Sequence, residues 1–200
     1  MINHCCDNPF RSHVQTQLDR NKYNDTPPIQ GTVLTPPKTI TDFNLIDHRS
    51  EPFRLAALQG KWSFVFFGYT HCPDICPTTL ATLAQMDKLL AEDAAVHEQT
   101  QVVFISVDPG RDTAAQLARY VPYFNQRFVG VTGTQEEIDR LTRELGILHL
   151  RIERGEGKPY LVDHSTAILL FQPDGTLRAL LTAPHEAQRL SSDFRAISGF

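Results

Sequence analysis

Two cysteines four residues apart, Cys72 and Cys76, are the residues of this 200-residue chain best suited to chemistry. They lie in a proline-rich polar loop after the apolar run 62–67, where a helix is expected to begin near Pro77. In open α/β sheets, ligands gather beyond the carboxyl ends of the strands. Side chains four apart on a helix share one face, so the two sulfurs could form a disulfide or bind one metal ion. A helix start favours the thiolate form, an effect that the carboxylate of Asp74 would oppose.

His164 is the candidate third ligand. It follows the short apolar stretch 160–162 and precedes a clear strand, and Asp163 beside it could orient the imidazole or a neighbouring loop. Two thiolates and an imidazole suit Cu(I) and Zn²⁺. Structural zinc takes four ligands, and these residues supply three, so the set favours copper. Taken alone, a histidine beside a strand is more often a polar edge residue. Met86 fits the apolar stripe of its helix and is interpreted as a core residue.

Composition excludes several classes of function. The net charge is −4, and no cluster of Lys and Arg indicates a nucleic-acid partner. The four cysteines form two close pairs, unlike the disulfide framework of a small secreted scaffold. A chain of 200 residues is long enough for one domain with a sizeable core and a tail.

The chain divides near Lys38. Residues 1–38 are polar, contain two Pro-Pro pairs and show neither helix nor strand period, which predicts a flexible tail or linker. Residues 39–200 are expected to form the domain. No signal peptide or transmembrane helix can be read in the sequence. His4-Cys5-Cys6 could be an additional metal or redox site, although vicinal cysteines near a terminus are more often incidental.

Within the domain, strands and helices alternate. The pattern predicts an α/β thioredoxin-like fold, with a central mixed sheet flanked by helices and an added N-terminal strand pair. The loop 108–112 is interpreted as a turn rather than a site. Two capping boxes, Thr113 with Gln116 and Thr134 with Glu137, begin two of the helices. The expected elements are a strand pair around a turn at 47–52, a helical turn at 55–59, strands at 62–67, 101–107 and 147–152, helices at 77–92, 113–121 and 134–146, a hairpin of 166–171 with 176–181, and a helix from about Pro184.

Several motifs together resemble the SCO/SenC copper chaperones over about residues 40–200. These are Gly68-Tyr-Thr-His-Cys-Pro-Asp-Ile-Cys-Pro77, Ser106-Val-Asp-Pro109 with Arg111-Asp112-Thr113, Val131-Thr-Gly-Thr134, and Tyr160-Leu-Val-Asp-His-Ser165. Thioredoxin-like redox sites normally have Cys-x-x-Cys, and this chain has one residue more between the cysteines. The cysteine and Asp-His-Ser motifs are specific to the family only in combination.

The resemblance implies one copper ion bound by Cys72, Cys76 and His164, with Asp74 and Asp163 as supporting neighbours. His71, next to the first cysteine, is not implied as a ligand. Such proteins help to assemble the dinuclear copper centre of cytochrome c oxidase. The implied partners are subunit II of that oxidase, other copper chaperones and a thiol reductant protein. The implied location is the periplasmic side of a bacterial inner membrane.

Two other functions stay open at this point. Cys72 and Cys76 could act as a thiol–disulfide oxidoreductase that reduces partner cysteines, and His164 would then be structural or a proton shuttle. A peroxidase-like redox sensor would instead form a stable sulfenic acid at one cysteine. The copper and redox functions would be linked, because a disulfide offers no thiolate to Cu(I).

Overall fold

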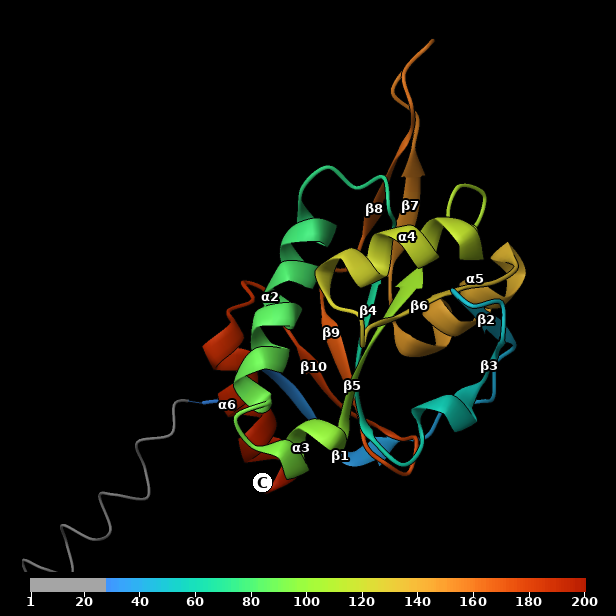
Figure 1. Ribbon diagram of the computed structural model, residues 1–200. Coiled ribbons are helices and arrows are strands. Elements are labelled where there is room, and N and C mark those ends of the chain that lie inside the picture. The colour runs from blue at the N-terminus through green and yellow to red at the C-terminus, as the bar shows by residue number, and fades with distance from the viewer. Residues whose placement is uncertain (1–27) are drawn as a thin grey trace, which may run out of the picture.

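The computed structural model describes residues 28–200 (Figure 1). His4-Cys5-Cys6, and with it most of the expected tail, lies outside the described residues. An eight-stranded mixed sheet forms the centre, in the order β1-β10-β9-β4-β5-β6-β2-β3, and helices flank it. The elements are β1 Gly31–Lys38, β2 Leu45–Asp47, β3 Pro52–Phe53, η1 Leu55–Leu58, β4 Trp62–Gly68, α2 Ile75–Leu90, α3 Ala94–Glu98, β5 Thr100–Ser106, α4 Ala114–Phe124, β6 Val129–Thr132, α5 Gln135–Leu145, β7 His149–Ile152, β8 Leu161–His164, β9 Ile168–Phe171, β10 Leu177–Leu181 and α6 Ala187–Ser198.

The central strands β4, β5 and β6 are parallel, and β9 joins β4 in antiparallel register. Every residue of β4 is buried, as are all residues of β5 except Gln101. A strand buried on both faces reads as a near-continuous apolar run, which explains why both strands are recognisable in the sequence. The expected α/β fold with a mixed central sheet is therefore confirmed. Met86 is buried in the core, as expected.

The prediction of a tail or linker over residues 1–38 is wrong at its C-terminal end, because residues 31–38 form strand β1. This strand lies at the edge of the sheet and pairs with β10, with an irregular register between Val33 and Lys38. Pro36 and Pro37 have no N–H group, and an edge strand tolerates proline because one side of it has no neighbour. The two prolines argue against a strand in the sequence, but they are compatible with a strand at the edge of the sheet. The division into a tail and a domain otherwise stays a prediction.

Two helices begin at the predicted capping residues, and one helix ends later than predicted. The hydroxyls of Thr113 and Thr134 accept hydrogen bonds from backbone amides three residues on, at 3.2 and 3.3 Å. Helix α5 ends at Gly146, whose φ of 74° is the left-handed conformation that glycine adopts readily. Helix α4 continues to Phe124, past Pro122, where the sequence predicted an end. Pro122 lies in the last turn of this helix.

The strand that carries His164 is not part of the main sheet. Strands β7 and β8 form a separate two-stranded antiparallel ribbon, in which His149 is opposite His164. Figure 1 shows this ribbon at the same end of the molecule as the loop between β4 and α2. The cysteine loop and the histidine strand therefore approach one another although they belong to different sheets.

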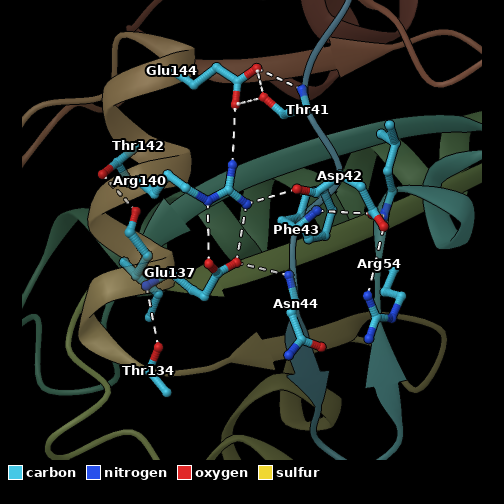
Figure 2. Close-up of polar contacts among 12 residues, drawn as sticks. Thr41, Asp42, Phe43, Asn44, Arg54, Thr134, Glu137, Arg140, Thr142 and Glu144 are labelled. Carbon is cyan, nitrogen blue, oxygen red and sulfur yellow. Dashed lines mark hydrogen bonds and ion pairs between the residues drawn. The ribbon is translucent and has the colours of Figure 1, made fainter.

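A polar network holds the segment before β2 against α5 (Figure 2). Glu144 accepts hydrogen bonds from the backbone amide and hydroxyl of Thr41, and Arg140 donates one to the carbonyl of Asp42 at 2.8 Å. Glu137 accepts a hydrogen bond from the amide of Asn44 and pairs with Arg140. Strand β2, which follows this segment, pairs with β6, so the added strand pair extends the main sheet.

Helix α6 packs on the sheet through Phe194, and this packing makes a testable prediction. The Phe194 ring is fully buried and makes edge contacts with Trp62 and Phe64, at centroid distances of 5.7 and 5.3 Å. We expect Phe194→Ala to lower the free energy of unfolding by about 3–5 kcal/mol, because it leaves a cavity. Denaturant titration of the variant and the unchanged protein measures this difference in the free energy of unfolding. Tyr123→Ala, at a ring 85% exposed, should change it by less than about 0.5 kcal/mol; equal losses would contradict the assignment of Phe194 to the core.

Candidate metal centre

Cys72, Cys76 and His164 come together at the end of β4. Their ligand atoms all lie within 4.8 Å of one another, and they form the one such group found among residues 28–200. Sγ of Cys76 is 3.2 Å from Nε2 of His164. Both cysteines are free thiols, Cys76 fully buried and Cys72 half-buried. Cys72 precedes α2 and Cys76 lies in its first turn, since α2 begins two residues before the expected Pro77.

The geometry of His164 fixes which of its ring nitrogens faces the cysteines. Nδ1 is 3.0 Å from the carbonyl oxygen of Ser165. A carbonyl can only accept, so Nδ1 carries a proton, and Nε2 is the ring nitrogen that faces Cys76. Asp163 was expected to orient this imidazole, but the Ser165 carbonyl makes that contact. The Phe66 and Tyr69 rings, each with its centroid 6.0 Å from the imidazole, flank the ring.

The loop that carries Cys72 is attached to the end of β5 through Asp112. The fully buried Asp112 carboxylate accepts hydrogen bonds from the amide and hydroxyl of Thr70, at 2.8 and 2.6 Å. It also accepts one from the hydroxyl of Ser106 at 2.6 Å. A buried carboxylate requires such donors. The loop 108–112, which the sequence suggested was only a turn, therefore positions the cysteine loop.

A second set of contacts joins the same loop to the β7–β8 ribbon. The guanidinium of Arg111 stacks on the Tyr160 ring at 3.6 Å, donates to the Tyr160 carbonyl at 3.0 Å, and pairs with Asp108. The Tyr160 hydroxyl donates to Asp108 at 2.8 Å. Tyr160 directly precedes β8, so these contacts constrain the strand that ends in His164. Sequence reasoning did not assign Arg111 or Tyr160 a role; the only signal was their place in the family-like motifs.

Gly68, the last residue of β4, provides space for the buried sulfur. A Cβ atom at this position would lie 2.8 Å from Sγ of Cys76 and 2.8 Å from Cε2 of Phe104. Both distances are shorter than van der Waals contact. Glycine is therefore required here for Cys76 to pack against the strand end, a role that sequence reasoning did not identify.

The two thiols are electrostatically different. The pKa of Cys72 is held well below its ordinary value, chiefly by a hydrogen bond from the Cys76 thiol, then by His164 and by the backbone amides of Asp74 and Cys76. The pKa of Cys76 is raised, because its proton is shared with Cys72 and because the group is buried. The Asp74 carboxylate was expected to oppose thiolate formation at Cys72, whereas its amide favours it. The lowered pKa of Cys72 and the raised pKa of Cys76 therefore favour one thiolate and one thiol at the site.

The centre is reachable from one side. A pocket of about 190 Å³ lies beside it, lined by Cys72 and His164 together with residues of both flanking segments. The lining residues are Tyr69, Cys72, Pro73, Asp74, Ile75, Leu161, Val162, Asp163, His164 and Thr166. Cys76 is not among them. A ligand from solution thus meets Cys72 and His164 before it meets the buried sulfur.

The pKa difference between the thiols predicts their reactivity in the reduced protein. Alkylation of Cys72 should follow a pH midpoint well below the ordinary thiol value of about 8.5, while Cys76 stays unreactive. Cys76→Ala removes the hydrogen-bond donor and should raise that midpoint, whereas Cys76→Ser retains a donor and should keep most of the shift. Rates are measured at each cysteine by mass spectrometry. A Cys72 midpoint near 8.5 that is unchanged in Cys76→Ala would contradict the shared proton.

The close packing at Gly68 predicts a large effect from one methyl group. Gly68→Ala should lower the free energy of unfolding by about 1–3 kcal/mol, because either Cys76 or Phe104 must move. Gly110→Ala is the matched control, since its Cβ would find its nearest neighbour at 3.9 Å. Both are measured by denaturant titration of the reduced protein. If the two substitutions cost the same, the requirement for glycine at the end of β4 is refuted.

Comparisons with known proteins agree with this fold. A family model described as SCO1/SenC matches residues 32–198. A protein of Stutzerimonas stutzeri is 40% identical over 169 residues, which cover 84% of this chain and 79% of that protein. The mitochondrial protein SCO2 homolog of Bos taurus is 38% identical over 154 residues, which cover 77% of this chain and 58% of that protein. The chain thus spans less than two thirds of the length of this mitochondrial relative.

A solved structure is also similar. The structure of Arabidopsis thaliana ScoI with copper bound is 34% identical, covers 78% of this chain and 98% of that chain, and superposes with a TM-score of 0.72. The family match, residues 32–198, covers well over half of the sequence. The chain belongs to the SCO1/SenC family.

Proposed function

We propose that this protein is a copper metallochaperone that assists assembly of the dinuclear copper centre of cytochrome c oxidase, and that Cys72, Cys76 and His164 bind the copper. The observation that carries the proposal is the convergence of two sulfurs and one imidazole nitrogen within 4.8 Å. Thiolates are soft ligands that favour Cu(I), and imidazole suits copper as well. The similar ScoI structure of Arabidopsis thaliana has copper bound.

The arrangement of the ligands suits a metal that must be released as well as held. Cys76 is fully buried and Cys72 is half-buried beside the open pocket. An acceptor thiolate entering the pocket would therefore displace Cys72 first, while Cys76 and His164 still hold the ion. Each metal–sulfur bond that breaks is replaced by a bond to a sulfur of the acceptor. The transfer therefore leaves the oxidation state of Cu(I) unchanged.

The proposed partners are cytochrome c oxidase subunit II or other copper chaperones, and a thiol reductant protein that keeps the cysteines reduced. The proposed location is the periplasmic side of a bacterial inner membrane. Among residues 28–200, none of the helices has the length and apolar character needed to cross a membrane.

A thiol–disulfide oxidoreductase is the second candidate, and the asymmetry of the two thiols favours it. Cys72 is the more exposed and has the lowered pKa, as an attacking thiol should. Cys76 is buried behind it and could resolve a mixed disulfide. This chemistry needs only the two cysteines, so His164→Ala should leave reduction of a disulfide substrate largely intact.

Anaerobic Cu(I) competition titration of the reduced protein tests the first proposal. We expect one copper per chain, with the affinity lowered at least roughly tenfold, or 1.4 kcal/mol, by Cys72→Ser and by His164→Ala. His71→Ala is the control, because His71 adjoins Cys72 but lies outside the three-ligand group. Tight binding that is indifferent to His164, or no tight binding, would reject the three-ligand site and favour the oxidoreductase.

A further inference from the structure

His149 lies directly opposite His164 in the β7–β8 ribbon. Side chains that face one another across an antiparallel pair lie on the same side of it, with their Cβ atoms about 4.5–5.5 Å apart. His164 turns that side toward Cys76, 3.2 Å away. Leu148 and Leu150 lie on the other side of the strand and are 78% and 64% exposed, whereas the His149 side chain is 17% exposed. Both histidines of the ribbon therefore point into the body of the protein.

Helix α5 receives the His149 side chain. Nε2 lies 3.2 Å from Oδ1 of Asp139 and 3.2 Å from the hydroxyl oxygen of Thr142. A carboxylate can only accept, so Nε2 carries a proton. The buried Thr142 hydroxyl donates to the carbonyl of Ile138 at 2.8 Å, which leaves its oxygen able to accept from Nε2 as well. The side-chain amide of Gln135 donates to the same Asp139 oxygen at 2.8 Å. Strand β7 is thereby attached to α5.

This attachment acts at the end of the ribbon where His164 lies. Strands β7 and β8 form a separate ribbon, so pairing with the main sheet does not set the position of His164. The contacts of Arg111 with Tyr160 constrain the start of β8, whereas His164 ends that strand. Helix α5 is a firm support, because three of its apolar side chains are buried in the core: Ile138, Leu141 and Leu145. The contact of His149 with α5 is therefore the one best placed to hold His164.

We propose that His149 is a positioning residue of the metal centre, which holds His164 toward Cys76 by anchoring β7 to α5. This inference rests on the proposed copper site. His149 lies outside the three-ligand group, so it acts through His164 rather than on the metal. An imidazole that is already in place loses little freedom when copper binds, and this raises the affinity. Without the anchor, the ribbon would be freer to turn away and leave Cu(I) with two sulfurs.

A double-mutant cycle on the Cu(I) affinity tests this role. The affinity is measured by anaerobic competition titration of the reduced protein, with His164 present and in His164→Ala. His149→Leu removes the Nε2–H donor and should lower the affinity about tenfold when His164 is present, the low end of what outer-shell partners of metal ligands cost. It should change nothing further in His164→Ala. His149→Gln, whose amide can still donate, should bind Cu(I) more tightly than His149→Leu.

Asp139→Ala tests the same contact from the side of α5. It removes an acceptor of the His149 proton and leaves β7 unaltered, so the test does not depend on the folding of His149→Leu. We expect it to lower the Cu(I) affinity when His164 is present. Glu136→Ala removes an exposed carboxylate from the first turn of the same helix and is the matched control. This control should leave the affinity unchanged.

The copper-free protein gives a second measurement. Aromatic rings shift the NMR signals of nearby protons, and the Phe66 and Tyr69 rings flank the His164 imidazole. We expect the carbon-bound ring protons of His164 to move toward the values of an exposed histidine in Asp139→Ala, and to stay where they are in Glu136→Ala. A role of the contact in stability alone would leave these signals unchanged in the folded protein.

The outcomes separate this inference from the proposed function. Tight binding that needs His164 but is unchanged in both His149→Leu and Asp139→Ala overturns the positioning role and leaves the proposed function standing. An equal loss in the His164→Ala background also overturns it, because His149 would then act on the cysteines or on the whole fold. Unchanged His164 signals in Asp139→Ala have the same consequence. Absence of tight binding, or tight binding indifferent to His164, overturns both proposals.

Discussion

The buried carboxylate of Asp112 is the interaction on which the site depends. It takes two hydrogen bonds from Thr70 and one from Ser106, and it could not be buried without donors except at a cost of several kcal/mol. Thr70 is two residues before Cys72, and Ser106 ends β5. The cysteine loop is thereby fixed to the central sheet rather than left as a free connection. The same loop, through Arg111, holds Tyr160 at the start of the histidine strand. One short segment thus positions both halves of the metal centre.

The site combines a rigid part with an accessible part. Cys76 is packed between the Gly68 backbone and His164, where solvent does not reach it. Cys72 lies at the edge of the pocket, and His164 belongs to a ribbon outside the main sheet. A buried ligand favours retention of a metal ion, whereas an exposed one favours exchange. The lowered pKa of Cys72 supplies a thiolate at neutral pH, so its deprotonation does not oppose binding.

The sequence predicts those helices, strands and caps that depend on patterns of neighbouring residues. The apolar runs of β4 and β5, the caps at Thr113 and Thr134, and the glycine that ends α5 are all visible within a few residues. Strand β1 was missed because its prolines are tolerated only at a sheet edge, which is a tertiary property. The roles of Asp112 and Arg111 were missed for a similar reason: their partners Thr70 and Tyr160 lie 42 and 49 residues away in sequence. His164 was placed with the cysteines, 88 residues from Cys76, only because the chemistry of the set and the family-like motifs pointed to it.

X-ray absorption spectroscopy at the copper edge tests the central claim most directly, because it reports the atoms bonded to the metal. The protein loaded anaerobically with one Cu(I) per chain should show two sulfur neighbours and one imidazole nitrogen. The nitrogen shell should disappear in His164→Ala, and one sulfur should disappear in Cys76→Ser. A copper ion bound by sulfur alone, with a spectrum unchanged in His164→Ala, would contradict the three-ligand centre.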